Sequence, residues 1–429
     1  MAPVVHILKN GARLVYIETD RFKSELLSMT ATVPLTAATA QENAMVLALA
    51  RRGTARHPSQ LLLNRHLDGM YSTAISTANR RTGDLQTLSL TADFLGARFV
   101  GGGRGLLPEV TRVLAELWQE PYKDENGAYQ AAYVESEKQV LSDAIRARIN
   151  APRAYARANC RALLLEGEPY ALSLIGEADT VDALNGKALA VRQGALVSGV
   201  APVFCYVGAT PLNEVAAMLE AHFAPFAAPT PFKTDIHAHT GAVRTATEEM
   251  PLSQGKLSLG FRTDLTPKDE LSAALVVMNE IYGGSPASKL FMNVRERRSL
   301  CYSCASSLDI YKGVLFADCG MRSANRAVTE EAMLAEFEAV KRGEITDTEL
   351  DAAKRSLLNA YRQSHDSAAS LARFHVGRLL VDKPEFVDDW RDKIARVTKV
   401  DVVNAAARVT EGACFFLNGT LDEGGTAYE

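Results

Sequence analysis

The chain has 429 residues, enough for about two or three domains that each bury a sizeable core. Hydrophobic residues make up 47% and charged residues 23%, which excludes collagen-like, coiled-coil and largely disordered proteins. Lys and Arg total 47 against 51 for Asp and Glu, so the net charge of -4 lacks the basic excess of nucleic-acid binders. The N-terminal residues lack a basic, apolar leader, and no segment reaches the ~18 apolar residues of a membrane span. We therefore expect a cytoplasmic protein with no membrane or nucleic-acid partner.

The predicted elements begin with a hairpin, in which residues 4–8 and 14–17 flank Asn10-Gly11. This dipeptide favours a type I′ turn because both of its residues tolerate positive φ. Residues 85–90 alternate between apolar and polar side chains, which indicates a further strand. Apolar residues at helical spacing then predict two long amphipathic helices, one through Val134, Leu141, Ile145 and Ile149, the other through Leu350, Ala353, Leu357 and Tyr361. Hairpins combined with one-sided helices predict an α+β layered fold.

A proline-rich stretch divides the chain almost in half. Three prolines fall within residues 224–232, which suits an extended connector. The two halves repeat one another, first at an offset of 230 or 231 residues and later near 216. We therefore predict a duplication, with homologous domains at 1–222 and 236–429 and a linker at 223–235. The matching pairs are Leu35-Thr36 with Leu265-Thr266, Gly53-Thr54 with Gly284-Ser285, Tyr71-Ser72 with Tyr302-Ser303, and Lys138 with Lys354.

Residues 283–303 carry a long motif: a small-residue loop, then Leu290-Phe291, then Val294-Arg295-Glu296, then Leu300-Cys301-Tyr302-Ser303. This segment resembles the second-domain signature of the pitrilysin/insulinase metallopeptidase family. The resemblance extends over nearly the whole chain, from the hairpin at residues 9–13 to the turn at 168–176. It implies a LuxS/MPP-like metallopeptidase fold, with two homologous domains that each have an antiparallel sheet with helices packed on one face.

The zinc motif of this family, His-x-x-Glu-His on a helix, is missing. Two histidines four residues apart share one face of a helix, and the Glu can act as base toward a metal-bound water. The corresponding stretch here, residues 44–52, contains no His, Asp, Glu or Cys. No two of the eight histidines lie four residues apart anywhere in the chain. We therefore expect no catalysis by this chain alone, and no cofactor in it.

The third zinc ligand of the family, a Glu on a distant helix, is also missing. Glu135 and Glu137 match the acidic start of that helix, but the ligand position seven residues after Glu137 is Ala144. Asp143 is adjacent, yet on a helix it points about 100° away. A second interpretation is an active metallopeptidase that uses unusual ligands such as His57, His66 and Glu137.

Arg295 and Tyr302 match the arginine and tyrosine that, by the resemblance, help active relatives bind the substrate backbone and stabilise an oxyanion. Arg donates two parallel hydrogen bonds and a phenol one more, which suits a carbonyl that gains charge. The alternative is structural: Arg295 pairs with an acid such as Glu296, and Tyr302 packs in a strand. Both interpretations stay open on the sequence.

Two further patterns could hold a metal. Cys301-Tyr302-Ser303-Cys304 has the spacing of redox and zinc sites, but in a predicted strand its two sulfurs would face opposite ways. His237-Ala238-His239 follows the linker, where solvent-exposed histidines are common. We therefore expect no metal at either place.

The favoured hypothesis is a non-catalytic subunit of a heteromeric zinc metallopeptidase. Such a pseudopeptidase would pair with a homologue that has an intact zinc motif and supplies the zinc, and together they would enclose a peptide substrate. Within the family, the sequence is similar to a bacterial group associated with 5-aminopentanol modification of elongation factor P. Besides the metallopeptidase with unusual ligands, a peptide-binding scaffold without a catalytic partner remains as an alternative.

Overall fold

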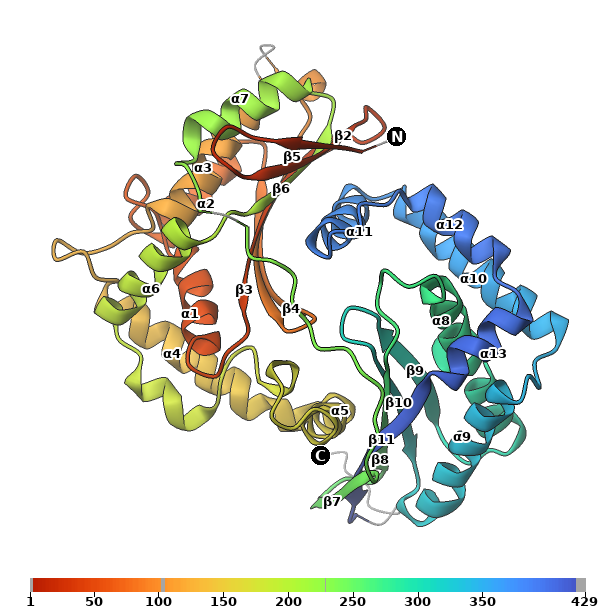
Figure 1. The fold of residues 1–429 in the computed structure, drawn as a ribbon. Coiled ribbons are helices and arrows are strands. Elements are labelled where there is room, and N and C mark those ends of the chain that lie inside the picture. The colour runs from red at the N-terminus through yellow and green to blue at the C-terminus, as the bar shows by residue number, and fades with distance from the viewer. Residues whose placement is uncertain (1–2, 102–104, 228, 422–429) are drawn as a thin grey trace. The chain divides into compact units, whose positions relative to one another are not determined.

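The computed structural model describes residues 3–101, 105–227 and 229–421. The chain forms two compact units, each built around one sheet (Figure 1). The first unit comprises Met1–Arg146, Leu172–Lys233 and Gln363–Phe386. The second comprises Ala147–Ala171, Thr234–Arg362 and Val387–Glu429. The units are therefore not two contiguous halves of the chain.

The first unit has a six-stranded sheet in the order β1-β2-β6-β3-β5-β4. Neighbouring strands are antiparallel except β2 and β6, which run parallel. The predicted opening hairpin is present, and Gly11 takes the positive φ of 88° that its turn requires. The strands are β1 (Val4–Ile7), β2 (Arg13–Glu18), β3 (Ser24–Pro34), β4 (Ala74–Thr82), β5 (Leu85–Leu95) and β6 (Val203–Gly208).

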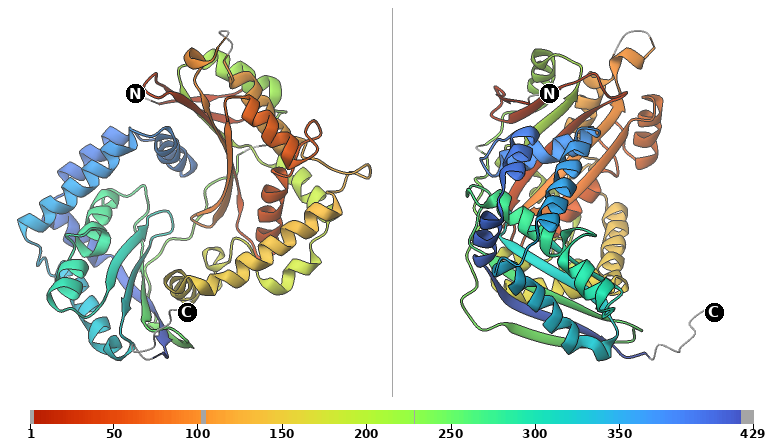
Figure 2. Two further views of the ribbon diagram at one scale, coloured as in Figure 1. Left: turned by 180° about the vertical axis from the view of Figure 1, so that it is seen from behind. Right: turned by 90° about the vertical axis from the view of Figure 1, so that its right-hand side faces the viewer.

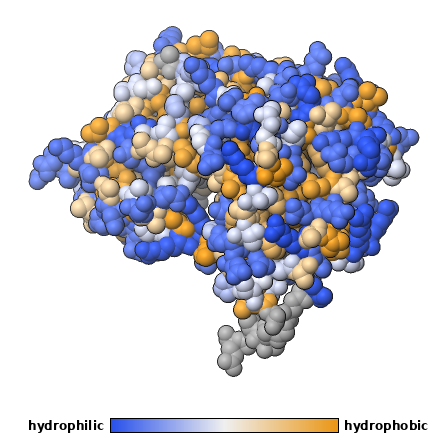
Figure 3. All heavy atoms as spheres, turned by 60° about the horizontal axis from the view of Figure 1, so that its bottom comes forward, coloured by the Kyte–Doolittle hydropathy of each residue, from blue (hydrophilic) through white to orange (hydrophobic). Residues whose placement is uncertain are grey.

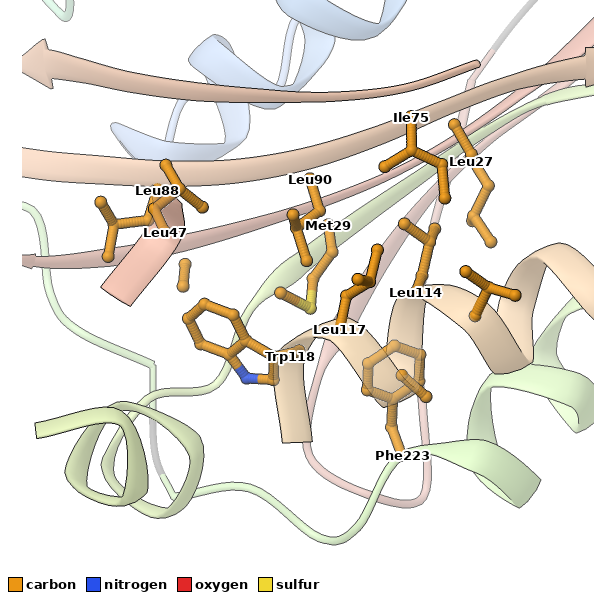
Figure 4. Close-up of a cluster of buried hydrophobic side chains, with 14 of the residues drawn as sticks. Leu27, Met29, Leu47, Ile75, Leu88, Leu90, Leu114, Leu117, Trp118 and Phe223 are labelled. Carbon is orange, nitrogen blue, oxygen red and sulfur yellow. The ribbon is translucent and has the colours of Figure 1, made fainter. Parts of the chain in front are cut away.

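Helices cover both faces of this sheet (Figures 1 and 2). On one face, Leu27 and Met29 of β3 pack with Leu114 and Trp118 of α3 in a buried hydrophobic core (Figure 4). The other face of the sheet is covered by α11. Because successive side chains of a strand point to opposite faces, Val15 of β2 points to this face, where it lines a cavity with residues of α11. The helices of this unit are α1 (Ala40–Ala50), α2 (Gln60–Gly69), α3 (Leu107–Gln119), α4 (Ala131–Arg146), α6 (Gly186–Gly199), α7 (Leu212–His222) and α11 (Ala368–Leu380).

The second unit has a five-stranded sheet in the order β7-β11-β8-β10-β9. This order repeats β2-β6-β3-β5-β4 of the first unit, and again the first pair, β7 and β11, is parallel. The repeated topology confirms the duplication predicted from the sequence offsets. The strands are β7 (Arg244–Met250), β8 (Gly255–Thr263), β9 (Ser303–Asp309), β10 (Val314–Met321) and β11 (Val409–Gly419).

Helices also lie on both faces of the second sheet (Figure 1). One face carries an aromatic cluster of Phe261, Tyr282 and Phe337, and the opposite face packs against α5. The helices are α5 (Pro152–Leu164), α8 (Ser272–Asn279), α9 (Arg326–Lys341), α10 (Asp347–Ser364), α12 (Val387–Arg396) and α13 (Lys399–Ala407), with π-helical segments at Glu280–Gly284 and Leu290–Arg297.

The helices α5 and α11 are exchanged between the two halves of the chain. Their first residues, Pro152 and Ala368, are 216 residues apart, as are their last residues, so they are counterparts in the duplication. Helix α5 nevertheless belongs to the second unit, whose strands come from the second half of the chain. Helix α11 belongs to the first unit, whose strands come from the first half. Gly260 and Gly412 make room for α5, because a Cβ on either would approach Leu164 to 3.2 Å and 2.7 Å.

The predicted α+β class with sheets that are mainly antiparallel is confirmed. Helices lie on both faces of each sheet and not on one face as expected, because α11 and α5 cover the second faces. The domain boundaries 1–222 and 236–429 differ from the observed units. The range 1–222 includes α5, which packs on the sheet of the second unit, and the range 236–429 includes α11, which packs on the sheet of the first. No helix within residues 3–101, 105–227 and 229–421 has the length and apolar character needed to cross a membrane. On the face seen in Figure 3, hydrophilic residues are interspersed with smaller groups of hydrophobic ones.

Candidate functional site

A cavity of about 480 Å³ lies in the second unit, beside the start of β9. Three segments form it: the end of the π-helical segment Leu290–Arg297, the loop that leads into β9, and the residues after β10. Its lining residues are Arg295, Glu296, Ser299, Leu300, Cys301, Tyr302, Arg322 and Asn325. The structure thus brings both site residues predicted from the sequence to one cavity.

Arg295 reaches the cavity from the last turn of the π-helical segment, which Leu290 and Val294 anchor in the core. Its guanidinium carbon lies 4.5 Å from the ring centroid of Phe291, a distance at which a cation–π contact orients the group. Its Nε is also 3.6 Å from Oε1 of Glu296. Both side chains of this ion pair are well exposed, so the pair contributes little to stability.

Tyr302 lies just before β9 and not within it, so the alternative that it packs in a strand does not hold. Its backbone N–H donates to the carbonyl of Gly320 at 2.8 Å, which fixes the residue to β10. Nε of Arg322 donates to the phenol oxygen at 3.4 Å. Because 48% of Tyr302 remains exposed, its hydroxyl group borders the cavity and not the core.

The cavity carries an excess of positive charge. Arg295 and Arg322 face a single carboxylate, that of Glu296, among its lining residues. Such a site suits carbonyl oxygens and carboxylates, to which guanidinium groups donate paired hydrogen bonds. Sequence reasoning missed Arg322, because only the register of β9 against β10 shows that it lies beside Tyr302.

Three cysteines meet at the edge of this cavity. The sulfur atoms of Cys301, Cys304 and Cys319 all lie within 4.8 Å of one another. Hydrogen bonds from Cys304 and Cys319, together with the nearby charge of Arg295, lower the pKa of the Cys301 thiol even though burial opposes this. The same hydrogen bonds raise the pKa of the other two thiols.

The expectation that Cys301 and Cys304 face opposite ways is therefore wrong. Strand β9 begins at Ser303, so Cys301 does not follow the alternation that was assumed for it. The loop before the strand turns its side chain to the same side as that of Cys304. Cys319 joins them because it pairs directly with Cys304 across β9 and β10.

The helices that would carry a zinc site, by the resemblance, carry an ion pair instead. Ala44 and Ala48 are half-buried on α1, and Arg52 follows four residues later, just beyond the end of the helix. Nε of Arg52 lies 2.5 Å from Oε1 of Glu137 on α4. Glu137 thus neutralises an arginine that ends the stretch matched, by the resemblance, to the zinc motif.

The alternative ligand set of His57, His66 and Glu137 does not form a group close enough to hold a metal ion, and Glu137 pairs with Arg52 instead. The two imidazole rings do stack, with centroids 4.4 Å apart, and burial lowers the pKa of both. Their neighbouring carboxylates are those of Glu109, 2.6 Å from His66, and Glu116, 3.8 Å from His57. Arg56 and Arg112 also contact these two carboxylates. The carboxylates beside the two histidines are thus already paired with arginine side chains.

Comparison with known proteins agrees with this geometry. A family model described as the peptidase M16 inactive domain matches residues 197–357. The chain is 28% identical to the probable inactive metalloprotease YmfF of Bacillus subtilis over 415 residues, which is 96% of this chain and 97% of YmfF. It is also 28% identical to an uncharacterized zinc protease of Mycobacterium tuberculosis over 66% of each protein.

Two solved structures share the fold. A conserved protein from Enterococcus faecalis has a TM-score of 0.88 at 23% identity and covers 98% of this chain and 99% of its own. A peptidase M16 inactive domain from Pseudomonas fluorescens has a TM-score of 0.81 at 18% identity and covers 99% of this chain and all of its own. The matches and the missing zinc ligands agree with one another: the chain resembles inactive members of the M16, or pitrilysin/insulinase, metallopeptidases.

Proposed function

We propose that this chain is the non-catalytic subunit of a heteromeric zinc metallopeptidase. In this role it closes a peptide-binding chamber and presents Arg295 and Tyr302 to the substrate. The partner is a homologue with an intact His-x-x-Glu-His motif, which supplies the zinc. A second copy of this chain could not take that place, because its α1 also lacks the ligands.

The observation that carries the proposal is the contrast between the two sites. The stretch of α1 matched to the zinc motif has no ligand side chain, the ligand position on α4 is Ala144, and Arg52, just beyond α1, forms an ion pair with Glu137 of α4. At the cavity, Arg295, Tyr302 and Arg322 still border one space of about 480 Å³. A chain with a purely structural role would not need hydrogen-bond donors gathered at one cavity. A subunit that binds a peptide would need them.

The expected chemistry is that of an oxyanion site. A zinc ion held by the partner would supply an activated water for attack on a peptide bond, and negative charge would then develop on the carbonyl oxygen. The guanidinium of Arg295 and the hydroxyl of Tyr302 can donate hydrogen bonds to the bound peptide, and these strengthen as the charge grows. Arg322 holds the phenol of Tyr302 in place through its hydrogen bond.

The test is to reconstitute the complex with the intact homologue from the same genome and to measure peptide turnover. We expect Arg295→Ala and Tyr302→Phe each to lower kcat on the order of 10²-fold, as removal of one oxyanion donor does, with the melting temperature and the subunit affinity unchanged. Arg297→Ala is the matched control, since Arg297 lies on the same segment and instead bonds Asn293 at 3.0 Å.

Three outcomes would contradict the proposal. If neither substitution affects turnover, Arg295 and Tyr302 take no part in the reaction. If the homologue is fully active alone, this chain is not needed for catalysis. Failure to form any complex, combined with peptide binding by this chain, would favour the scaffold without a catalytic partner.

A further inference from the structure

The sulfur atoms of the three-cysteine cluster (Cys301, Cys304 and Cys319) lie close together, which the spacing of these residues in the sequence does not suggest. Among the described residues, it is the one group of three or more His, Cys, Asp or Glu side chains whose ligand atoms gather closely enough to hold one metal ion. The other three cysteines, Cys160, Cys205 and Cys414, are buried elsewhere and belong to no such group within the described chain.

The sheet holds two of the three sulfurs, those of Cys304 and Cys319, firmly in place. Cys304 and Cys319 are direct partners in the register of β9 and β10, and both are almost completely buried. Asp318, the preceding residue on β10, points to the opposite face, where it meets Arg157 of α5. Cys319 therefore faces the helices on the other side of the sheet. Such donors on strands are better fixed than donors on loops.

The cluster is closed on one side and open on the other. Cys304 and Cys319 are 4% and 2% exposed, whereas Cys301 belongs to the lining of the cavity that Arg295 and Tyr302 border. An ion held by the three sulfurs would have its remaining position toward that cavity. Three protein ligands with one open position is a common arrangement for zinc.

The distances and charges suit a soft cation. A zinc–sulfur bond of ~2.3 Å in tetrahedral geometry places two sulfurs ~3.8 Å apart, so sulfurs within 4.8 Å need to approach by at most ~1 Å. Thiolate donors select zinc and Cu(I) over hard cations such as magnesium and calcium. Three thiolates around Zn²⁺ leave a net charge of -1, which Arg295 and Arg322 of the cavity lining can offset.

We propose that Cys301, Cys304 and Cys319 form a binding site for one thiophilic metal ion of the Zn²⁺ class. The site differs from the zinc centre of active M16 enzymes in its ligands, its elements and its unit. Its role is positional: Cys301 and Tyr302 are neighbours in the chain, so a bound ion fixes the loop that carries Tyr302. The expectation that this chain has no metal is replaced by this proposal.

The experiment uses the full chain, reduced and freed of metal by a chelator, and titrates it with Zn²⁺ against a chromophoric chelator. We expect one equivalent per chain, and with Co²⁺ as a spectroscopic probe a thiolate-to-metal charge-transfer band. Cys301→Ala, Cys304→Ala and Cys319→Ala should each weaken binding by more than ~100-fold, beyond the 10–100-fold typical of outer partners of a metal ligand. Cys414→Ala, which removes a buried thiol of the same unit, should leave binding unchanged.

A second measurement needs no variant and so does not depend on whether the variants fold. Zn²⁺ should slow the alkylation of three of the six thiols in the wild-type chain, and mass spectrometry should map the protected thiols to residues 301, 304 and 319. The proposal is overturned if no equivalent binds, if His237→Ala or His239→Ala abolishes binding, or if glutathione disulfide converts two of the three thiols to a disulfide in a chain that binds no metal.

These readouts require neither a partner subunit nor a peptide. Failure of the metal proposal therefore leaves the proposed role of Arg295 and Tyr302 standing, and failure of that role leaves the metal site standing.

Discussion

At the scale of single residues, His375 links the stability of the first unit to pH. It lies on α11 with 6% of its surface exposed. Burial lowers its pKa from 6.5 to about 4 and His365 adds to this effect, while a hydrogen bond to the backbone of Glu385 opposes it. The imidazole is therefore neutral in the folded protein at pH values where the unfolded chain already binds a proton.

The sign of the pH dependence follows from this difference. Between pH 6.5 and 4 the unfolded state binds more protons, so the free energy of unfolding falls as the pH falls, by up to about 3 kcal/mol in total. Above pH 6.5 this contribution is fully present. His375→Gln should flatten the curve in that window. Chemical denaturation followed by the fluorescence of Trp118, in a Trp390→Phe background, would report on the first unit alone.

Equal slopes for wild-type protein and His375→Gln would contradict this assignment. His6→Gln is the matched control, because that histidine lies on the edge strand β1 and is more accessible to solvent.

The cysteines show what single residues reveal in a sequence and what they do not. The spacing of Cys301 and Cys304 is visible, but their orientation depends on where β9 begins, and strand ends are set by tertiary pairing. Cys319 carries no local signal at all, since only strand register brings it to the pair. Arg295 and Tyr302 could be found because a long motif contains both, yet their shared cavity could not.

At the scale of elements, Glu168 ties the segment Ala147–Ala171 to the second sheet. Its carboxylate lies 2.6 Å from Nζ of Lys312, a fully buried side chain, and also bonds Arg262. Burial alone would raise the pKa of Glu168, but hydrogen bonds from Arg262 and Lys312 lower it overall. The carboxylate thus stays ionised between two cations that lie inside the protein.

Glu168→Ala should destabilise the second unit by about 3–5 kcal/mol, because both cations lose the carboxylate that they share. Glu166→Ala is the control from the same segment: Glu166 is 75% exposed and pairs with Arg244 on the surface, so its loss should cost less than about 0.5 kcal/mol. Denaturation followed by Trp390 in a Trp118→Phe background measures both. Equal effects of the two substitutions would show that the pairing of Glu168 with Arg262 and Lys312 adds nothing to the stability of the unit.

The elements themselves were largely predictable, whereas one aspect of their packing was not. Sequence offsets gave the repeated topology, and Asn10-Gly11 gave the first hairpin. The exchange of α5 and α11 left no comparable signal. An amphipathic pattern states that one face of a helix is buried, but it does not say against which of two homologous sheets.

At the scale of the whole molecule, the chain passes between its two units five times. A cut at the proline-rich connector therefore does not separate two self-sufficient domains. The fragment 1–233 lacks α11, so side chains such as Val15, which line a cavity with His375 and Leu379, lose their cover. It also retains α5 without the sheet against which that helix packs.

We expect the fragment 1–233 to lack a cooperative thermal transition and to bind a hydrophobic dye. Fusing residues 363–386 to its C-terminus through a flexible linker should restore a cooperative melt and the near-ultraviolet signal of Trp118, because α11 again covers the sheet. A fusion with a scrambled 363–386 sequence is the control. Cooperative melting of the unfused fragment, at the temperature of the full chain, would contradict this expectation.

The exchange of α5 and α11 also bears on the order in which the ribosome can complete the protein. Domains commonly fold from the N-terminus onward during synthesis. Here, residues 203–208 complete the sheet of the first unit, but its covering helix emerges only after residue 380. The nascent chain must carry an unfinished apolar sheet face while most of the second unit is translated. Chaperone contact during that interval should therefore concentrate on β2, β3 and β6, and it should end when α11 leaves the exit tunnel.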